Sequence, residues 1–119
     1  MAIFAAWLPA APAAAEVVDI AWGDSGSFER SVDVAPGRFV EACTELRRGT
    51  AVRWRFEAGA TLDFNVHYHE GSDVRYPVPN APRREAEGRL VVPTDHAMCW
   101  MWTNRTPAPV RLDLRLVRS

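Results

Sequence analysis

A strict alternation of apolar and charged residues near the C-terminus constrains the fold more than any other feature of this chain. From Val110 to Leu116, every second side chain is Val or Leu, and the side chains between them are Arg or Asp. Successive side chains of an extended strand point to opposite faces, so this period buries one face and leaves the other in water. The segment therefore predicts a half-buried β-strand.

The same alternation recurs along the chain. It covers Thr50–Glu57 and Leu62–His69, while His96–Thr103 is apolar on both faces, as is typical of a central strand. Shorter or less regular candidate strands are Val17–Trp22, Phe28–Val34, Arg38–Leu46 and Arg89–Val92. Turn residues separate these segments, and no helical period follows Ala15.

This pattern predicts an all-β fold, an antiparallel β-sandwich of roughly seven or eight strands. The Pro-rich and charged segment Pro77–Glu87 is expected to form an exposed loop between strands. The apolar phase of the alternating strands predicts the main core residues, which are Trp54, Phe56, Phe64, Val66, Leu112 and Leu114.

Composition narrows the classes of function. The chain has 119 residues and a formal charge of −1, which fits a single folded domain. Its 14 basic residues, all Arg, nearly balance its 15 acidic residues, so a strongly basic surface for nucleic acid is excluded as the default. No run of about 18 apolar residues is present, and no transmembrane helix is expected.

The first fifteen residues differ from the rest of the chain. Met1–Ala15 carries no charge and ends in three alanines, the small-residue pattern that a signal peptidase accepts. We expect a signal peptide at 1–15, one domain at 16–119 and a periplasmic or secreted location. No basic residue precedes the apolar run, so either the true start lies upstream or the signal is atypical. An Ala-rich N-terminal helix packed on the domain is the alternative.

The two cysteines have three possible states. In an oxidising compartment Cys43 and Cys99 can form a disulfide bond. Two buried free thiols, or Cys99 as a metal ligand, are the alternatives that the residues themselves leave open.

The histidines and methionines form the one chemical constellation in the sequence. His67 and His69 share a strand face about 6–7 Å apart, and both are expected to reach the surface, where a His-x-His pair can chelate an ion. His96 and Met98 share a face of a later strand, and imidazole with thioether suits copper. We therefore expect a copper site with His67, His69, His96 and Met98 as candidate ligands.

Other interpretations compete with the copper site. Met98 in an aromatic strand is more often core filler than a ligand. A metal-free protein-interaction domain would use exposed aromatic residues such as Tyr68, Tyr76 and Trp102. A cupin-like metalloenzyme fits less well, because the spacing beyond His67, His69 and Glu70 does not match. The sequence has no nucleophile elbow and no phosphate-binding loop, so enzymatic activity is not expected.

Several motifs together resemble a known family. They are Cys43, Gly49, the strand that begins Asp63-Phe64, Gly88 with the Pro93-Thr94-Asp95 turn, and the run Cys99–Asn104. This pattern resembles the GOLD (Golgi dynamics) domain, and above all small exported bacterial proteins with a related domain. The resemblance implies a β-sandwich that binds partners without enzymatic activity, and a disulfide between Cys43 and Cys99.

Overall fold

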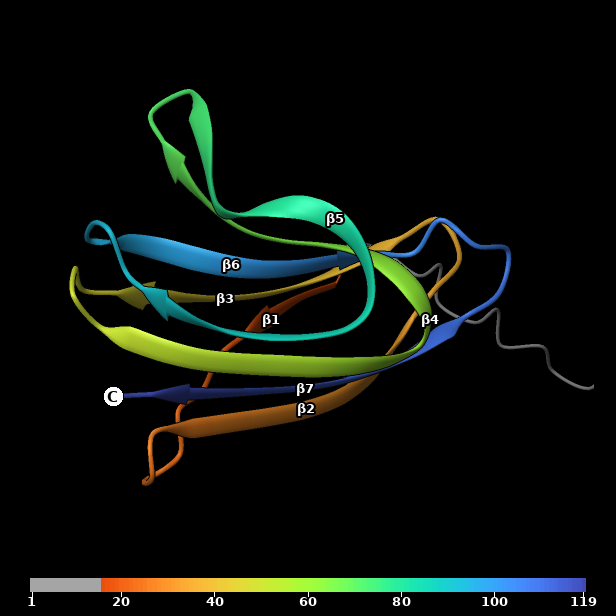
Figure 1. The fold of residues 1–119 in the computed structure, drawn as a ribbon, viewed down its shortest axis with the longest axis horizontal. Coiled ribbons are helices and arrows are strands. Elements are labelled where there is room, and N and C mark those ends of the chain that lie inside the picture. The colour runs from red at the N-terminus through yellow and green to blue at the C-terminus, as the bar shows by residue number, and fades with distance from the viewer. Residues whose placement is uncertain (1–15) are drawn as a thin grey trace, which may run out of the picture.

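The computed structural model describes residues 16–119, and every regular element in that range is a β-strand (Figure 1). The strands are β1 (Glu16–Asp19), β2 (Ser27–Val34), β3 (Phe39–Leu46), β4 (Ala51–Glu70), β5 (Asp73–Val91), β6 (His96–Thr103) and β7 (Val110–Arg118). The expected signal peptide at 1–15 lies outside the described residues. Over residues 16–119 there is no helix of the length and apolarity needed to cross a membrane.

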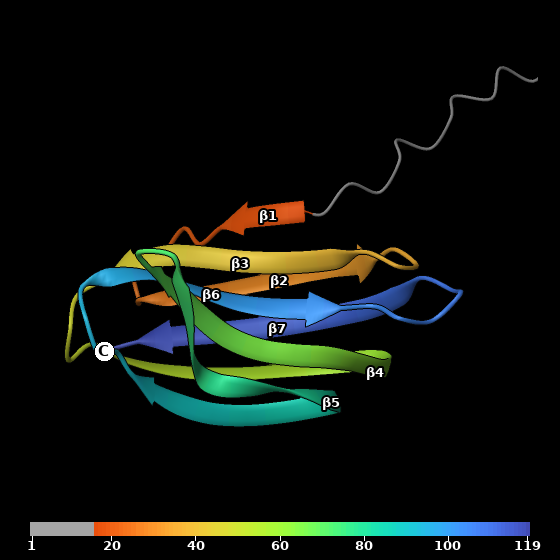
Figure 2. The same ribbon diagram turned by 90° about the horizontal axis from the view of Figure 1, so that it is seen from above.

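The strands form one curled sheet in the order β1-β3-β6-β4-β7-β2, with β5 paired to β4. The curl creates two layers, with β3 and β6 in one and β7 and β2 in the other, and the bent hairpin β4–β5 belongs to both (Figure 1). Figure 2 shows β1 and β5 at opposite edges of the molecule. The predicted all-β sandwich is confirmed, and the described pairs are antiparallel except for the parallel pair β1–β3.

β4 is a single 20-residue strand where the sequence pattern suggested two. Its first half pairs with β7 and its second half pairs with β6, so the strand passes from one layer to the other. The register with β5 shifts between Glu57 and Leu62, an irregularity of the kind that bends a strand. Side chains at even-numbered positions face the core on both sides of this bend, which is why the alternation continues through it.

The expectation of a loop at Pro77–Glu87 is wrong, because this segment is part of β5. Pro77, Pro79 and Pro82 lack the N–H that a central strand would need. β5 pairs only with β4 in the described sheet, and an edge strand tolerates proline on its open side. The segment is largely exposed, as the sequence suggested.

The core lies between the two layers. All six residues predicted for it are buried, with exposed fractions from 0% for Val66 and Leu112 to 8% for Trp54. Aromatic rings meet at its centre, since the Phe64 centroid lies 4.9 Å from Trp54, 4.7 Å from Phe56 and 5.3 Å from Trp102. The prediction of the core is confirmed.

Two residues fix the packing locally. Gly88 pairs with Trp54 across β4 and β5, and a Cβ added to Gly88 would lie 2.5 Å from the indole. Asn104 is fully buried beyond β6, and its amide Nδ2 donates to the carbonyls of Val34 at 2.9 Å and Ala108 at 2.8 Å. Its Oδ1 accepts from the Thr106 backbone N–H at 2.8 Å, so one side chain ties the last turn to β2.

Candidate functional site

On the outer face of the β3–β6 layer, the side chains around His67 are shielded from water. We call the residues Glu41, Cys43, Asn65, His67 and Cys99 the covered face. The side chain of His67 is 7% exposed and that of Glu41 is 16% exposed, and His67 Nε2 lies 3.0 Å from Glu41 Oε1. His67 Nδ1 lies 2.8 Å from Asn65 Oδ1. Both ring nitrogens of His67 therefore have protein partners.

The expectation that His67 reaches the surface is wrong because β5 returns over it. Asn65 Nδ2 donates to Asn80 Oδ1 of β5 at 3.1 Å, and the ring of Tyr76 lies 6.0 Å from the His67 ring. Burial lowers the pKa of His67 below its ordinary value of 6.5. The carboxylate of Glu41 opposes this effect, and the nearby His69 adds to it.

The four predicted metal ligands lie on two opposite faces of the sheet. His69 is exposed, and its ring centroid is 5.4 Å from that of His67. His96 instead stacks on Tyr68, with centroids 5.7 Å apart, and Tyr68 points to the face opposite His67. Met98 is fully buried in the core. The arrangement thus brings His67 and His69 together and leaves Met98 in the core. His69 and His96 line one hollow at the end of β6, so His96 lies near His69 but not on the face of His67.

Cys43 and Cys99 form a disulfide between β3 and β6, as predicted. The two residues are direct partners in the register, with a Cα–Cα distance of 4.2 Å. Glu41 lies beside them, and its carboxylate with the two sulfur atoms is the one cluster of three potential metal-binding groups within residues 16–119. Because the sulfurs are bonded to each other, they offer no thiolate to an ion.

The aromatic residues proposed for an interaction site are not all exposed. Tyr76 is 51% exposed, while Tyr68 is partly buried against the core. Trp102 is only 1% exposed, so its assignment to an exposed site is wrong. Its strand is central, and the face of β6 that carries Trp102 points between the layers.

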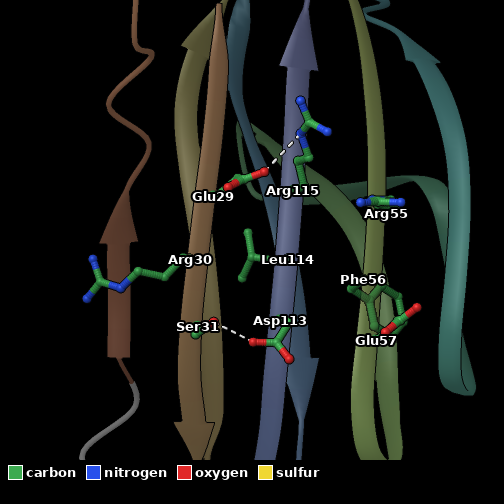
Figure 3. A pocket seen from close by; sticks show the side chains of 9 residues that line it. All are labelled: Glu29, Arg30, Ser31, Arg55, Phe56, Glu57, Asp113, Leu114 and Arg115. Carbon is green, nitrogen blue, oxygen red and sulfur yellow. Dashed lines mark hydrogen bonds and ion pairs between the residues drawn. The ribbon is translucent and has the colours of Figure 1, made fainter.

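The opposite layer presents an open surface that we call the charged face. It is the outer side of β2, β7, the first half of β4 and the last part of β5, and Figure 3 shows part of it. Its charged residues are Glu29 and Asp33 of β2, Arg111, Asp113 and Arg115 of β7, Arg53, Arg55 and Glu57 of β4, and Glu85, Glu87 and Arg89 of β5. All of them are exposed.

The register places like charges directly opposite each other on this face. Glu57 pairs with Asp113 on one side and with Glu85 on the other. Arg55 pairs with Arg115 on one side and with Glu87 on the other, and two residues along the strand Arg53 pairs with Arg89. Like charges at directly opposed positions destabilise a sheet. These like-charge pairs oppose folding in the free protein, whereas the opposite-charge pairs Glu29–Arg115, Asp33–Arg111 and Arg55–Glu87 on the same face favour it.

Few of these charges are neutralised within the chain. Arg115 Nε lies 3.2 Å from Glu29 Oε1, and Arg111 Nε lies 3.5 Å from Asp113 Oδ1. The hydroxyl of Ser31 donates to Asp113 (Figure 3), and this hydrogen bond, with Arg111, lowers the pKa of Asp113. Over the described range, no ion pair within 4.0 Å involves the arginines at 53, 55 and 89 or the glutamates at 57 and 85.

Sequence reasoning placed these residues outward but missed the site. The alternation shows that Arg55 and Glu57 face water, because Trp54 and Phe56 face the core. It does not show which strand lies beside β4, or in which register. The like-charge rows arise only when β7 and β5 pair with it on its two sides.

Solved structures share this fold. PliG of Aeromonas hydrophila, a periplasmic inhibitor of g-type lysozyme, has a TM-score of 0.71 and 10% sequence identity, over 89% of this chain and 98% of that chain. The PliG of Salmonella Typhimurium has a TM-score of 0.61 and 11% identity, over 87% and 99%. A mutant PliG of Escherichia coli has a TM-score of 0.64 and 11% identity, over 89% and 100%.

These likenesses define the class of the chain as an all-β sandwich with the architecture of PliG. At 10–11% identity they establish the fold alone. No protein-family model and no curated protein matches the chain. The resemblance to the GOLD domain therefore stays a prediction.

Proposed function

We propose that this chain is an exported β-sandwich that acts by binding a protein partner through the charged face. The observation that carries the proposal is the pairing of like charges on that exposed face. Such pairs weaken the free protein, and a partner that presents opposite charges would relieve the repulsion on binding. The disulfide between Cys43 and Cys99 supports export, because disulfides persist in oxidising compartments.

The fold suggests which partner to test first. Three solved structures that match this chain over nearly their whole length are periplasmic inhibitors of g-type lysozyme. We therefore take a secreted or periplasmic protein as the partner class, and a g-type lysozyme as its first candidate. The same fold can carry different binding sites, so the assignment depends on the surface of this chain.

A titration with lysozyme tests the proposal. Purified protein is added to a g-type lysozyme, and both the hydrolysis of bacterial cell walls and the heat of binding are measured. We expect saturable binding that weakens as salt rises, because exposed charges are screened at high ionic strength. Absence of binding to this lysozyme and to any protein of a periplasmic extract would contradict the proposed function.

Copper binding at His67 and His69 is a second proposal. The ring centroids lie 5.4 Å apart on one face, which supports a two-imidazole site. His67 would first have to release Glu41 or Asn65, because each holds one of its ring nitrogens. A competition titration with copper(I) tests this, with His67→Ala/His69→Ala expected to lose binding. Equal affinity in the double variant would reject the site.

A further inference from the structure

We propose that Arg53, Arg55, Arg89 and Arg115 form an anchor for a short acidic segment of the partner protein. We call these four residues the arginine cluster. The inference rests on the proposed function and adds the chemistry of the contact.

The geometry gathers the four side chains in one place. Arg53 and Arg89 are opposite each other across β4 and β5, and Arg55 and Arg115 are opposite each other across β4 and β7. All four line one shallow hollow of about 590 Å³ on the charged face. Trp54, Gly88 and the half-buried Val117 also line it, and Glu87 is the one acidic residue among its lining, so four arginines face a single carboxylate there.

The charges of the cluster are largely unsatisfied. Of the four arginines of the cluster, only Arg115 forms an ion pair within residues 16–119, and its partner is Glu29. A planar guanidinium binds a carboxylate through two parallel hydrogen bonds, a geometry that four neighbouring arginines can offer to two or three carboxylates. The ligand class is therefore an anion with several separate carboxylates.

The surroundings favour a short acidic peptide segment over a nucleic acid. Glu29 and Glu87 flank the cluster in the row of Arg55 and Arg115. The next row holds Asp113, Glu57 and Glu85. A long phosphate backbone would have to cross these carboxylates. A protein segment can place its acids on the cluster and its basic side chains on the acidic row.

The test uses the full chain labelled with ¹⁵N and a tri-glutamate peptide as the probe. A tri-lysine peptide, inorganic phosphate and a single-stranded oligonucleotide are titrated in parallel. We expect the Nε–H signals of Arg53, Arg55 and Arg89 to shift saturably with tri-glutamate. Stronger binding of the oligonucleotide, binding of phosphate alone as tightly as the peptide, or no saturable shift would overturn the inference.

Variants make the test specific. Arg53→Gln/Arg89→Gln is expected to bind the peptide at least ten-fold more weakly and to raise the melting temperature, since one like-charge pair is removed. Arg38→Gln/Arg83→Gln, at two exposed arginines outside the cluster, should change neither quantity. Equal peptide binding by the first variant and the parent would refute the cluster.

The failure of the cluster and the failure of the proposed function have different signatures. A g-type lysozyme or other protein that binds Arg53→Gln/Arg89→Gln as tightly as the parent overturns the cluster and leaves the proposed function intact. If the tri-glutamate peptide binds at the cluster but the chain binds no protein partner, the proposed function is overturned and the cluster stands as an anion-binding site.

Discussion

The covered face and the charged face are both outer surfaces of the same sandwich, but polar side chains are buried and hydrogen-bonded on the first and exposed and largely unpaired on the second. On the covered face, His67 has partners at both ring nitrogens and β5 shields it from water. On the charged face, Glu57 stands between Asp113 and Glu85 with no compensating base within 4.0 Å in the described chain. A satisfied, shielded cluster stabilises the fold, whereas an exposed row of like charges destabilises it and is accessible to a partner.

The comparison also shows what the most conspicuous motif in the sequence does in the fold. His-x-His on a strand draws attention because imidazoles bind metals. In the structure, His67 serves as a buried hydrogen-bonded residue next to the disulfide, and the charged positions that looked like ordinary solvated strand faces form the more informative surface.

The disulfide of the covered face should give the largest effect on stability. Cys43 and Cys99 are 56 residues apart, so Cys43→Ala/Cys99→Ala should lower the free energy of unfolding by about 4 kcal/mol. Urea denaturation of the parent and the variant measures this. Reduction of the parent with dithiothreitol should reproduce the loss, and a difference below about 1 kcal/mol would mean that the packing of β3 on β6 suffices without the bond.

Gly88 beneath the charged face should give the next largest effect. In Gly88→Val, the new Cβ would meet the indole of Trp54 at 2.5 Å, and we expect a loss of about 3 kcal/mol from overpacking. Gly59→Ala is the matched control, because its Cβ would have no neighbour closer than 3.8 Å. Thermal unfolding of both variants checks the contrast. Equal melting temperatures would show that β5 can move away from Trp54.

A matched pair of glutamates compares the two faces directly. Glu41→Ala leaves His67 Nε2 buried without its partner, and a loss of roughly 1–3 kcal/mol is expected. Glu57→Ala removes a charge opposed by two others, so stability should stay constant or rise by a few tenths of a kcal/mol. Denaturant titration of both variants decides the matter. A destabilised Glu57→Ala protein would contradict the account of the charged face.

The burial of His67 should make stability depend on pH, and we expect this effect to be the smallest of those considered. Burial lowers its pKa in the folded state below the unfolded value of 6.5, so the unfolded chain binds the proton more readily. The stabilisation by neutral His67 is fully present above pH 6.5 and is lost as pH falls toward the folded pKa. His67→Gln should flatten this slope in melting temperatures measured between pH 7 and 5. An unchanged slope would assign the effect to another group.

Much of the fold follows from the sequence because the physical signal is local. The alternation over Val110–Leu116 and Thr50–Glu57 fixes which side chains face the core, and the buried positions agree with it. The Pro-rich part of β5 was missed, since its local preferences describe a loop and only pairing with β4 makes it a strand. Long-range pairing decided that element.

Which residues meet in the candidate site is decided almost entirely by such long-range strand pairing. Cys43 and Cys99 could be matched because there are only two cysteines. The burial of His67 required knowing that β5 folds back over β4, a distant contact with no signature around His67 itself. The opposition of Arg53 to Arg89 likewise exists only in one register of a hairpin, and a register shifted by two residues would pair different charges.

We propose that the partner binds the charged face. The most direct measurement is the dissociation constant for a g-type lysozyme, determined by calorimetry for the parent, for Arg55→Gln/Glu57→Gln and for His69→Gln/Arg83→Gln. The first variant changes two exposed charges of the charged face, and the second changes two exposed residues elsewhere. We expect at least a ten-fold loss of affinity in the first variant and none in the second. Equal affinities for the parent and the first variant would contradict the proposal.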